Sequence, residues 1–124
     1  MTSEGCIAAA LAFVLLAGCG DFHRGAGDGS GGSDVPTFAA DIHPILMSHC
    51  AGCHKPSNKK MPLSGDATRD YTTVSALVVA GDSAASLLQR KATGAVSHGG
   101  GTPLPANGAE ALTVASWIDG GALP

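Results

Sequence analysis

Two cysteines and a histidine stand together in Cys50-Ala51-Gly52-Cys53-His54, called here the CAGCH segment. Cysteines three positions apart lie on the same side of a helical turn, so both sulfur atoms can reach one partner. The imidazole of His54 follows directly and adds a nitrogen that can bind a metal. Small residues between the cysteines let the backbone approach that partner closely. The segment therefore predicts a disulfide, a metal site or a bond to a cofactor.

Among these possibilities, the C-x-x-C-H spacing is the signature of covalent haem attachment. Cys50 and Cys53 would form thioethers with the two vinyl groups on one edge of the porphyrin, and His54 would bind the iron as the proximal ligand. Two alternatives have less support. A thioredoxin-like redox pair needs a βαβ context, which the sequence does not show. A zinc site needs two more ligands, for which His43 and His49 are available.

Length and composition set further limits. A chain of 124 residues suffices for one domain and is too short for a two-domain enzyme. Its net charge of −3 leaves no basic surface to bind nucleic acid. With one Trp, one Tyr and three Phe, the core is poor in large aromatic residues. Such a small domain needs a disulfide, a metal or a cofactor for stability, and a buried haem would supply apolar area.

The amino-terminal part indicates export. An apolar run over residues 7–17 is too short for a permanent transmembrane helix and fits the core of a signal peptide, although no Lys or Arg precedes it. The run ends in Leu16-Ala17-Gly18-Cys19, which resembles a bacterial lipobox. That resemblance implies lipidation of Cys19 as the first residue of the mature protein. A plain signal peptide cut near Gly18 is the alternative.

These features divide the chain into three parts. Residues 1–18 are predicted to be a signal peptide, which would remove Cys6. Residues 19–35 are rich in Gly, Ser and Asp and are predicted to be a flexible tether. Residues 36–124 are the predicted domain, in which only the two cysteines of the CAGCH segment remain.

Helical spacing predicts a first helix over about 38–51. Asp41 as its N-cap would place Pro44 in the first turn, where the missing N–H costs no hydrogen bond. One face of this helix is predicted to be part of the core: Ile42, Ile45, Leu46 and His49. A second helix is predicted over Tyr71–Val79, with Asp70 as its N-cap, Gly81 as its stop and three inward residues: Val74, Leu77 and Val78.

Two more helices are predicted in the carboxy-terminal half. A third covers about 84–92, and a fourth follows a capping box formed by Asn107 and Glu110 and ends at Gly120. Trp117 is predicted to pack against the first helix. No stretch shows the alternation of a strand, so the predicted fold class is all-α.

In this order the segments resemble a class I c-type cytochrome domain of the small, exported, bacterial mono-haem kind. The resemblance covers about residues 35–123 and lies in three segments that match the start, middle and end of that family: Phe38–Leu46 leading into the CAGCH segment, Gly81–Leu88 and Trp117–Gly121. The resemblance implies a cytochrome c-like bundle of about four short helices and loops, wrapped around one covalently bound haem c.

The sixth iron ligand departs from the family pattern. The family places a Met before a Pro on the far side of the iron, but the matching sequence at 103–105 is Pro-Leu-Pro, and Leu cannot bind iron. His98, followed by three glycines, is the favoured distal ligand, unless it hydrogen-bonds a propionate or a backbone carbonyl instead. Met61 is the less favoured candidate, Met47 is expected in the core, and an open or water-bound iron is the remaining alternative.

These features predict a mono-haem c-type cytochrome that carries single electrons between exported redox partners and is not an enzyme. We expect it on the periplasmic side of a bacterial membrane, held there by a lipid at Cys19, with other redox proteins as partners. The main alternative is a haem-based sensor or peroxidase-like domain with an open distal iron site. In a further alternative, haem only stabilises the fold of a recruitment module.

Overall fold

The structure is a computed structural model that describes residues 35–124. Within these residues the chain forms helices and no strand, which confirms the prediction of an all-α domain with about four short helices. In chain order these are η1 (Phe38–Ile42), α1 (His43–His49), α2 (Ala67–Ser75), α3 (Leu87–Ala92) and α4 (Ala109–Asp119). Among them, none has the length and apolar character that a membrane crossing requires. The predicted signal peptide, the lipidation site at Cys19 and the predicted tether up to residue 34 lie outside the described residues.

The first helical segment begins with η1, a single π-helical turn, and continues as α1. Its N-cap is Thr37, whose side chain accepts a hydrogen bond from the N–H three residues later at 3.4 Å. The prediction of Asp41 as the N-cap is therefore wrong. The Asp41 carboxylate instead accepts a hydrogen bond from the Thr37 N–H at 2.7 Å. Pro44 is tolerated because it lies at the start of α1, where the hydrogen-bond pattern changes and no regular N–H is needed.

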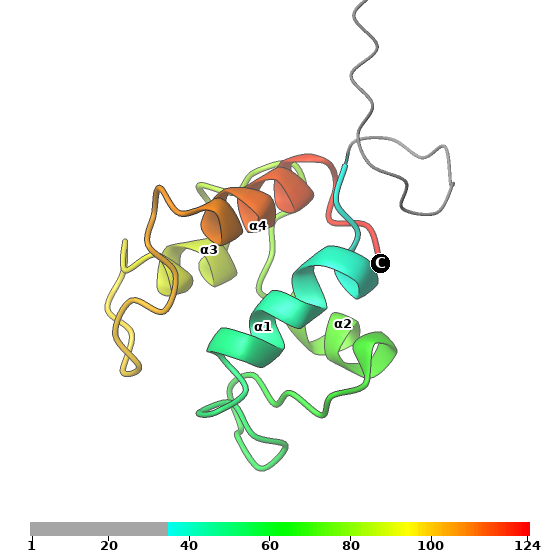
Figure 1. Cartoon of the computed structure of the whole chain (residues 1–124), viewed down its shortest axis with the longest axis vertical. Coiled ribbons are helices and arrows are strands. Elements are labelled where there is room, and N and C mark those ends of the chain that lie inside the picture. Colours follow the sequence, from blue (N-terminus) through cyan, green and yellow to red (C-terminus); the bar gives the residue numbers. More distant parts are fainter. Residues whose placement is uncertain (1–34) are drawn as a thin grey trace, which may run out of the picture. The chain divides into compact units, whose positions relative to one another are not determined.

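The core is built around aromatic side chains from three helical segments. Phe38 of η1 lies 5.3 Å from Tyr71 of α2 and 5.6 Å from Trp117 of α4, measured between ring centroids. Trp117 is fully buried and donates a hydrogen bond from its indole N–H to the Leu123 carbonyl at 2.6 Å. The predicted packing of Trp117 against the first helix is confirmed. Figure 1 shows the end of the chain beside the start of η1, where the Phe38 N–H donates to Leu123.

The second helix begins and ends earlier than predicted. Its N-cap is Asp66, whose side chain accepts the N–H of the third residue after it at 2.8 Å. Gly81 does not stop the helix; it lies in the turn that follows, with a φ of 84°, and donates its N–H to Ile118 of α4. The predicted inward residues do contact the core, one fully and two partly buried: Val74, Leu77 and Val78.

Asp70, predicted to be an N-cap, lies inside α2 with its side chain fully buried. Its carboxylate accepts hydrogen bonds from the Ser64 N–H and hydroxyl, both at 2.7 Å, and from the Gly65 N–H at 3.0 Å. It also lies 3.0 Å from Nε2 of His43 in α1. Burial raises the pKa of Asp70, but the hydrogen bonds from Ser64, His43 and Gly65 outweigh burial and hold the pKa below its usual value.

The last two helices pack against each other (Figure 1). The capping box predicted between Asn107 and Glu110 does not form, because the N-cap of α4 is Gly108 and no side chain bonds there. The Glu110 carboxylate instead lies 3.0 Å from the ring of His49. The prediction that His49 belongs to the core is therefore wrong, since its ring lies at the surface in this pair. As predicted, α4 ends before Gly120.

Candidate functional site

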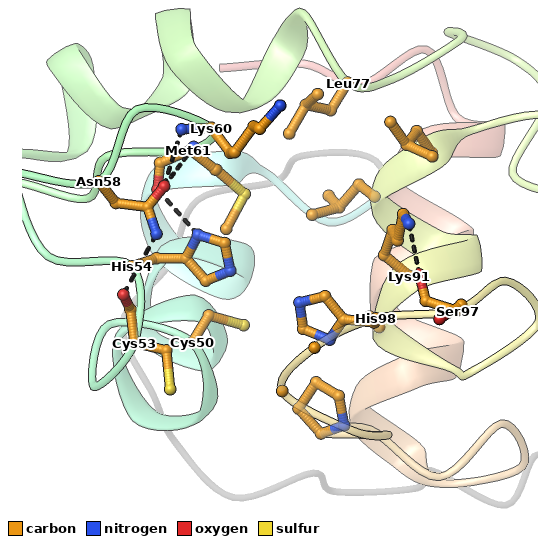
Figure 2. A pocket seen from close by; sticks show the side chains of 16 residues that line it. Cys50, Cys53, His54, Asn58, Lys60, Met61, Leu77, Lys91, Ser97 and His98 are labelled. Carbon is orange, nitrogen blue, oxygen red and sulfur yellow. Dashed lines mark hydrogen bonds between the residues drawn. The ribbon is translucent and has the colours of Figure 1, made fainter.

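A cavity of about 660 Å³ lies between the CAGCH segment and α3 with the loop after it (Figure 2). Sites of about 300–1,000 Å³ are typical for small-molecule ligands and cofactors. Its walls are largely apolar and include Met61, Leu77, Leu87, Leu88, Ala92 and Pro103. The cavity also gathers the sequence-predicted residues Cys50, Cys53, His54 and His98. Residues from opposite halves of the domain thus meet at one site.

The CAGCH segment continues from α1 as a tight turn. The N–H of Cys50 donates to the Leu46 carbonyl at 2.8 Å, and the N–H groups of Cys53 and His54 donate to the Cys50 carbonyl at 3.1 and 2.9 Å. The turn brings both sulfur atoms and the His54 ring to one wall of the cavity (Figure 2). Both thiols are free. Burial raises the pKa of the Cys50 thiol, and the neighbouring Cys53 raises this pKa further.

The ring of His54 is held by one backbone contact. Its Nδ1 lies 3.1 Å from the Met61 carbonyl oxygen. Because a carbonyl oxygen only accepts, Nδ1 is the donor, and in the neutral ring Nε2 then has a free lone pair. Figure 2 shows Nε2 directed into the cavity. A backbone carbonyl in this position is the usual orienting contact of a metal-binding histidine.

The ring of His98 is held in the same way. Its Nδ1 lies 3.1 Å from the Gly101 carbonyl, so its Nε2 also has a free lone pair. The glycines permit this conformation: Gly101 has a φ of 75°, and a Cβ on Gly100 would lie 3.0 Å from His98 Cε1. The alternative in which His98 hydrogen-bonds a backbone carbonyl is therefore met at Nδ1. This bond occupies only one of the two ring nitrogens.

The two imidazole rings face each other across the cavity (Figure 2). The ring centroids of His54 and His98 are 5.9 Å apart, and the ring planes differ by 6°. Metal–imidazole nitrogen bonds are about 2 Å long, so two rings on opposite sides of one metal ion have centroids on the order of 6 Å apart. His54 and His98 would therefore be the residues that hold a metal ion in this cavity.

The methionines occupy other places. Met61 is buried, and its backbone lies on the His54 side of the cavity, where its carbonyl accepts the His54 hydrogen bond (Figure 2). Met47 is half-buried against the core, as expected. Leu104, which stands where the resemblance to cytochromes would place a Met, is fully buried, and its N–H donates to the Ala92 carbonyl at 3.0 Å. This arrangement favours His98 over Met61 as the candidate ligand on the side of the cavity opposite His54.

The residues of the rival zinc site are engaged elsewhere. His43 pairs with Asp70, and His49 pairs with Glu110, so each ring is already engaged with a carboxylate. Within residues 35–124, no group of three His, Cys, Asp or Glu side chains has the geometry to hold a metal ion by itself. The helices around the CAGCH segment also differ from the βαβ surroundings of a thioredoxin-like pair.

Several contacts at the site have no signal in the sequence. The Met61 and Gly101 carbonyls that orient the two rings belong to the backbone, and any residue type supplies them. The Lys91 ammonium donates a hydrogen bond to the Ser97 carbonyl beside His98, which sequence spacing does not indicate. Leu77 and Pro103 line the cavity because of tertiary packing alone.

Comparison of the chain with protein-family models, with curated proteins and with solved structures finds no match in any of the three.

Proposed function

We propose that residues 36–124 form a cytochrome c-like domain that binds one haem c and carries single electrons. The observation that carries this proposal is the pair of facing, nearly parallel imidazoles of His54 and His98 beside two free thiols in a largely apolar cavity. No other group of side chains in the described residues combines covalent attachment points with two free ring nitrogens.

The thiols would hold the cofactor at one edge. Each S–H would add across one vinyl group, so that sulfur would bond to one carbon and the hydrogen would go to the other. Cys50 and Cys53 stand on the same wall as His54, which fits attachment of the porphyrin edge next to the proximal ligand. When bound, haem supplies the one-electron redox centre that the chain itself lacks.

The histidines would set the properties of that centre. The hydrogen bonds to backbone carbonyls would orient the His54 and His98 rings and strengthen their donation to the iron, which would stabilise its oxidised form. Histidine in place of methionine acts in the same direction, so a low reduction potential is expected. With His54 and His98 both holding the iron, little would have to rearrange when its charge changes, which suits electron transfer.

The location and partners follow from the amino-terminal sequence. Export and a lipid at Cys19 would place the domain on the periplasmic side of a bacterial membrane. Its partners would be other exported redox proteins, and the protein itself would not be an enzyme. A haem-based sensor or peroxidase-like domain requires an open distal site. The direction of His98 into the cavity favours the carrier over this alternative.

The proposal is tested on the full chain produced in bacteria that attach haem to C-x-x-C-H sequences. Haem should remain with the wild-type protein during acid-acetone extraction. It should be lost from the double variant Cys50→Ala/Cys53→Ala and kept by the control His49→Ala, which changes a surface residue beside the segment. Pigment that extracts completely from the wild-type protein would refute the proposal.

A further inference from the structure

We propose that Lys91 is a positioning residue that keeps His98 directed into the cavity. The proposal rests on the proposed function, because it concerns the side chain proposed as the distal ligand. Lys91 is the penultimate residue of α3, and its side chain lines the cavity. Its ammonium donates a hydrogen bond to the carbonyl of Ser97, the residue before His98 (Figure 2).

Four backbone hydrogen bonds tie the loop that carries His98, residues 93–104, to α3, and two of them stand on either side of its tip. The Val96 N–H donates to the Arg90 carbonyl at 3.2 Å, and the Leu104 N–H donates to the Ala92 carbonyl at 3.0 Å. Between these anchors, residues 97–103 include three glycines and no buried side chain. Ordering such a segment costs much conformational entropy, and few contacts offset that cost. The tip of the loop is therefore expected to open easily unless another contact holds it.

Lys91 provides that contact. Within residues 35–124, one side chain from outside the loop donates a hydrogen bond to residues 97–103. That side chain is Lys91, and its acceptor is the Ser97 carbonyl. A bond from an ammonium group is charge-assisted and stronger than a bond between neutral groups. The other hydrogen bonds at the tip join His98 to Gly101 and move with the loop as a unit. Lys91 is thus the link between the tip and the rigid helix.

Lys60 offers a matched control. It is also a lysine that lines the cavity, but it stands on the opposite wall, beside Met61 (Figure 2). Its backbone N–H bonds to Asn58, and its side chain has no hydrogen bond to residues 93–104. Substitution of Lys60 therefore removes one positive charge from the cavity and leaves the contact to the loop in place.

The experiment compares Lys91→Met, Lys91→Arg and Lys60→Met with the wild-type holoprotein. Hydrogen exchange of the amides in residues 93–104 measures how often the loop opens. Imidazole titration of the oxidised protein measures how readily an added ligand replaces His98. Lys91→Met should speed the exchange and raise the imidazole affinity, each by about tenfold, the scale of one charge-assisted hydrogen bond. Lys91→Arg keeps the donor and should restore both, and Lys60→Met should resemble the wild type.

Unchanged amide exchange in Lys91→Met would overturn the role of Lys91, whether or not haem is bound. An equal rise in imidazole affinity for Lys60→Met would also overturn it, because charge rather than the hydrogen bond would then be responsible. A wild-type protein that carries no haem would refute only the proposed function. The exchange comparison on that protein would still decide whether Lys91 holds the loop.

Discussion

The buried carboxylate of Asp70 joins α2 to α1 through His43, whose Nε2 lies 3.0 Å from it. The same carboxylate accepts two hydrogen bonds from Ser64, which follows closely after Met61 in the loop from the CAGCH segment. That loop supplies the carbonyl that orients His54. A residue that does not line the cavity therefore fixes one of its walls.

Asp70→Asn should destabilise the domain by about 2 kcal/mol or more, because an amide nitrogen then faces backbone and side-chain donors in a buried place. Urea unfolding measures this loss. Asp66→Asn removes the same charge from the N-cap of the same helix, where Asn is about as good a cap as Asp, and should change stability little. Equal losses in the two variants would show that charge, and not the buried network, is responsible.

The low pKa of Asp70 predicts a specific dependence of stability on acid. Its contribution is fully present above the carboxyl pKa of the unfolded chain, about 3.9, and is lost as the pH falls through the lower pKa of the folded state. The unfolding free energy of the wild type should therefore fall as the pH drops below about 4. Asp70→Asn should show a shallower fall in urea titrations at several pH values. Parallel curves for the two proteins would contradict the assignment.

The glycines after His98 provide a test of its ring position. A Cβ on Gly100 would lie 3.0 Å from His98 Cε1, which is closer than ordinary contact, so Gly100→Ala should displace the ring by a few tenths of an ångström. A Cβ on Gly99 meets nothing within 4 Å. Gly100→Ala should raise the affinity of the oxidised protein for imidazole by roughly threefold or more, and Gly99→Ala should not. The reverse order would indicate that His98 does not occupy the distal place.

The reduction potential should respond to the identity of the distal ligand. His98→Met offers a thioether from the same loop, and a thioether favours ferrous iron, so the potential should rise by on the order of 0.1 V. A redox titration followed by absorption measures this change. Met61→Leu should leave the potential nearly unchanged, because Met61 stands on the His54 side. A large shift in Met61→Leu with none in His98→Met would reverse the assignment of the ligand.

The sequence predicted which segments are helical better than it predicted where the helices begin and end. Periodic apolar residues decide that a segment is helical, whereas caps depend on which polar side chain the tertiary structure leaves free. Asp70 and Glu110 both have the residue type and position of a cap, yet the first is drawn into a buried network and the second pairs with His49 across two helices. The contact of Asp70 with His43 spans 27 residues and that of Glu110 with His49 spans 61, so neither can be read from local sequence.

The site itself was predictable where spacing alone determines it. Cys50, Cys53 and His54 lie within one turn, so their convergence follows from local geometry. His98 is 44 residues after His54 (98 − 54), and only the packing of α3 and its loop brings the two rings to 5.9 Å. The glycines after His98 suggested a close approach, but the orienting carbonyls and Lys91 required the structure.

The most direct test of the account is the electron paramagnetic resonance spectrum of the oxidised, purified full-length protein. Two axial imidazoles with nearly parallel planes, as in the 6° arrangement of His54 and His98, give a rhombic low-spin signal. We predict that signal in the wild type and in His49→Ala, and its replacement by a high-spin signal in His98→Ala. A high-spin wild-type spectrum, or a low-spin signal that survives in His98→Ala, would contradict it.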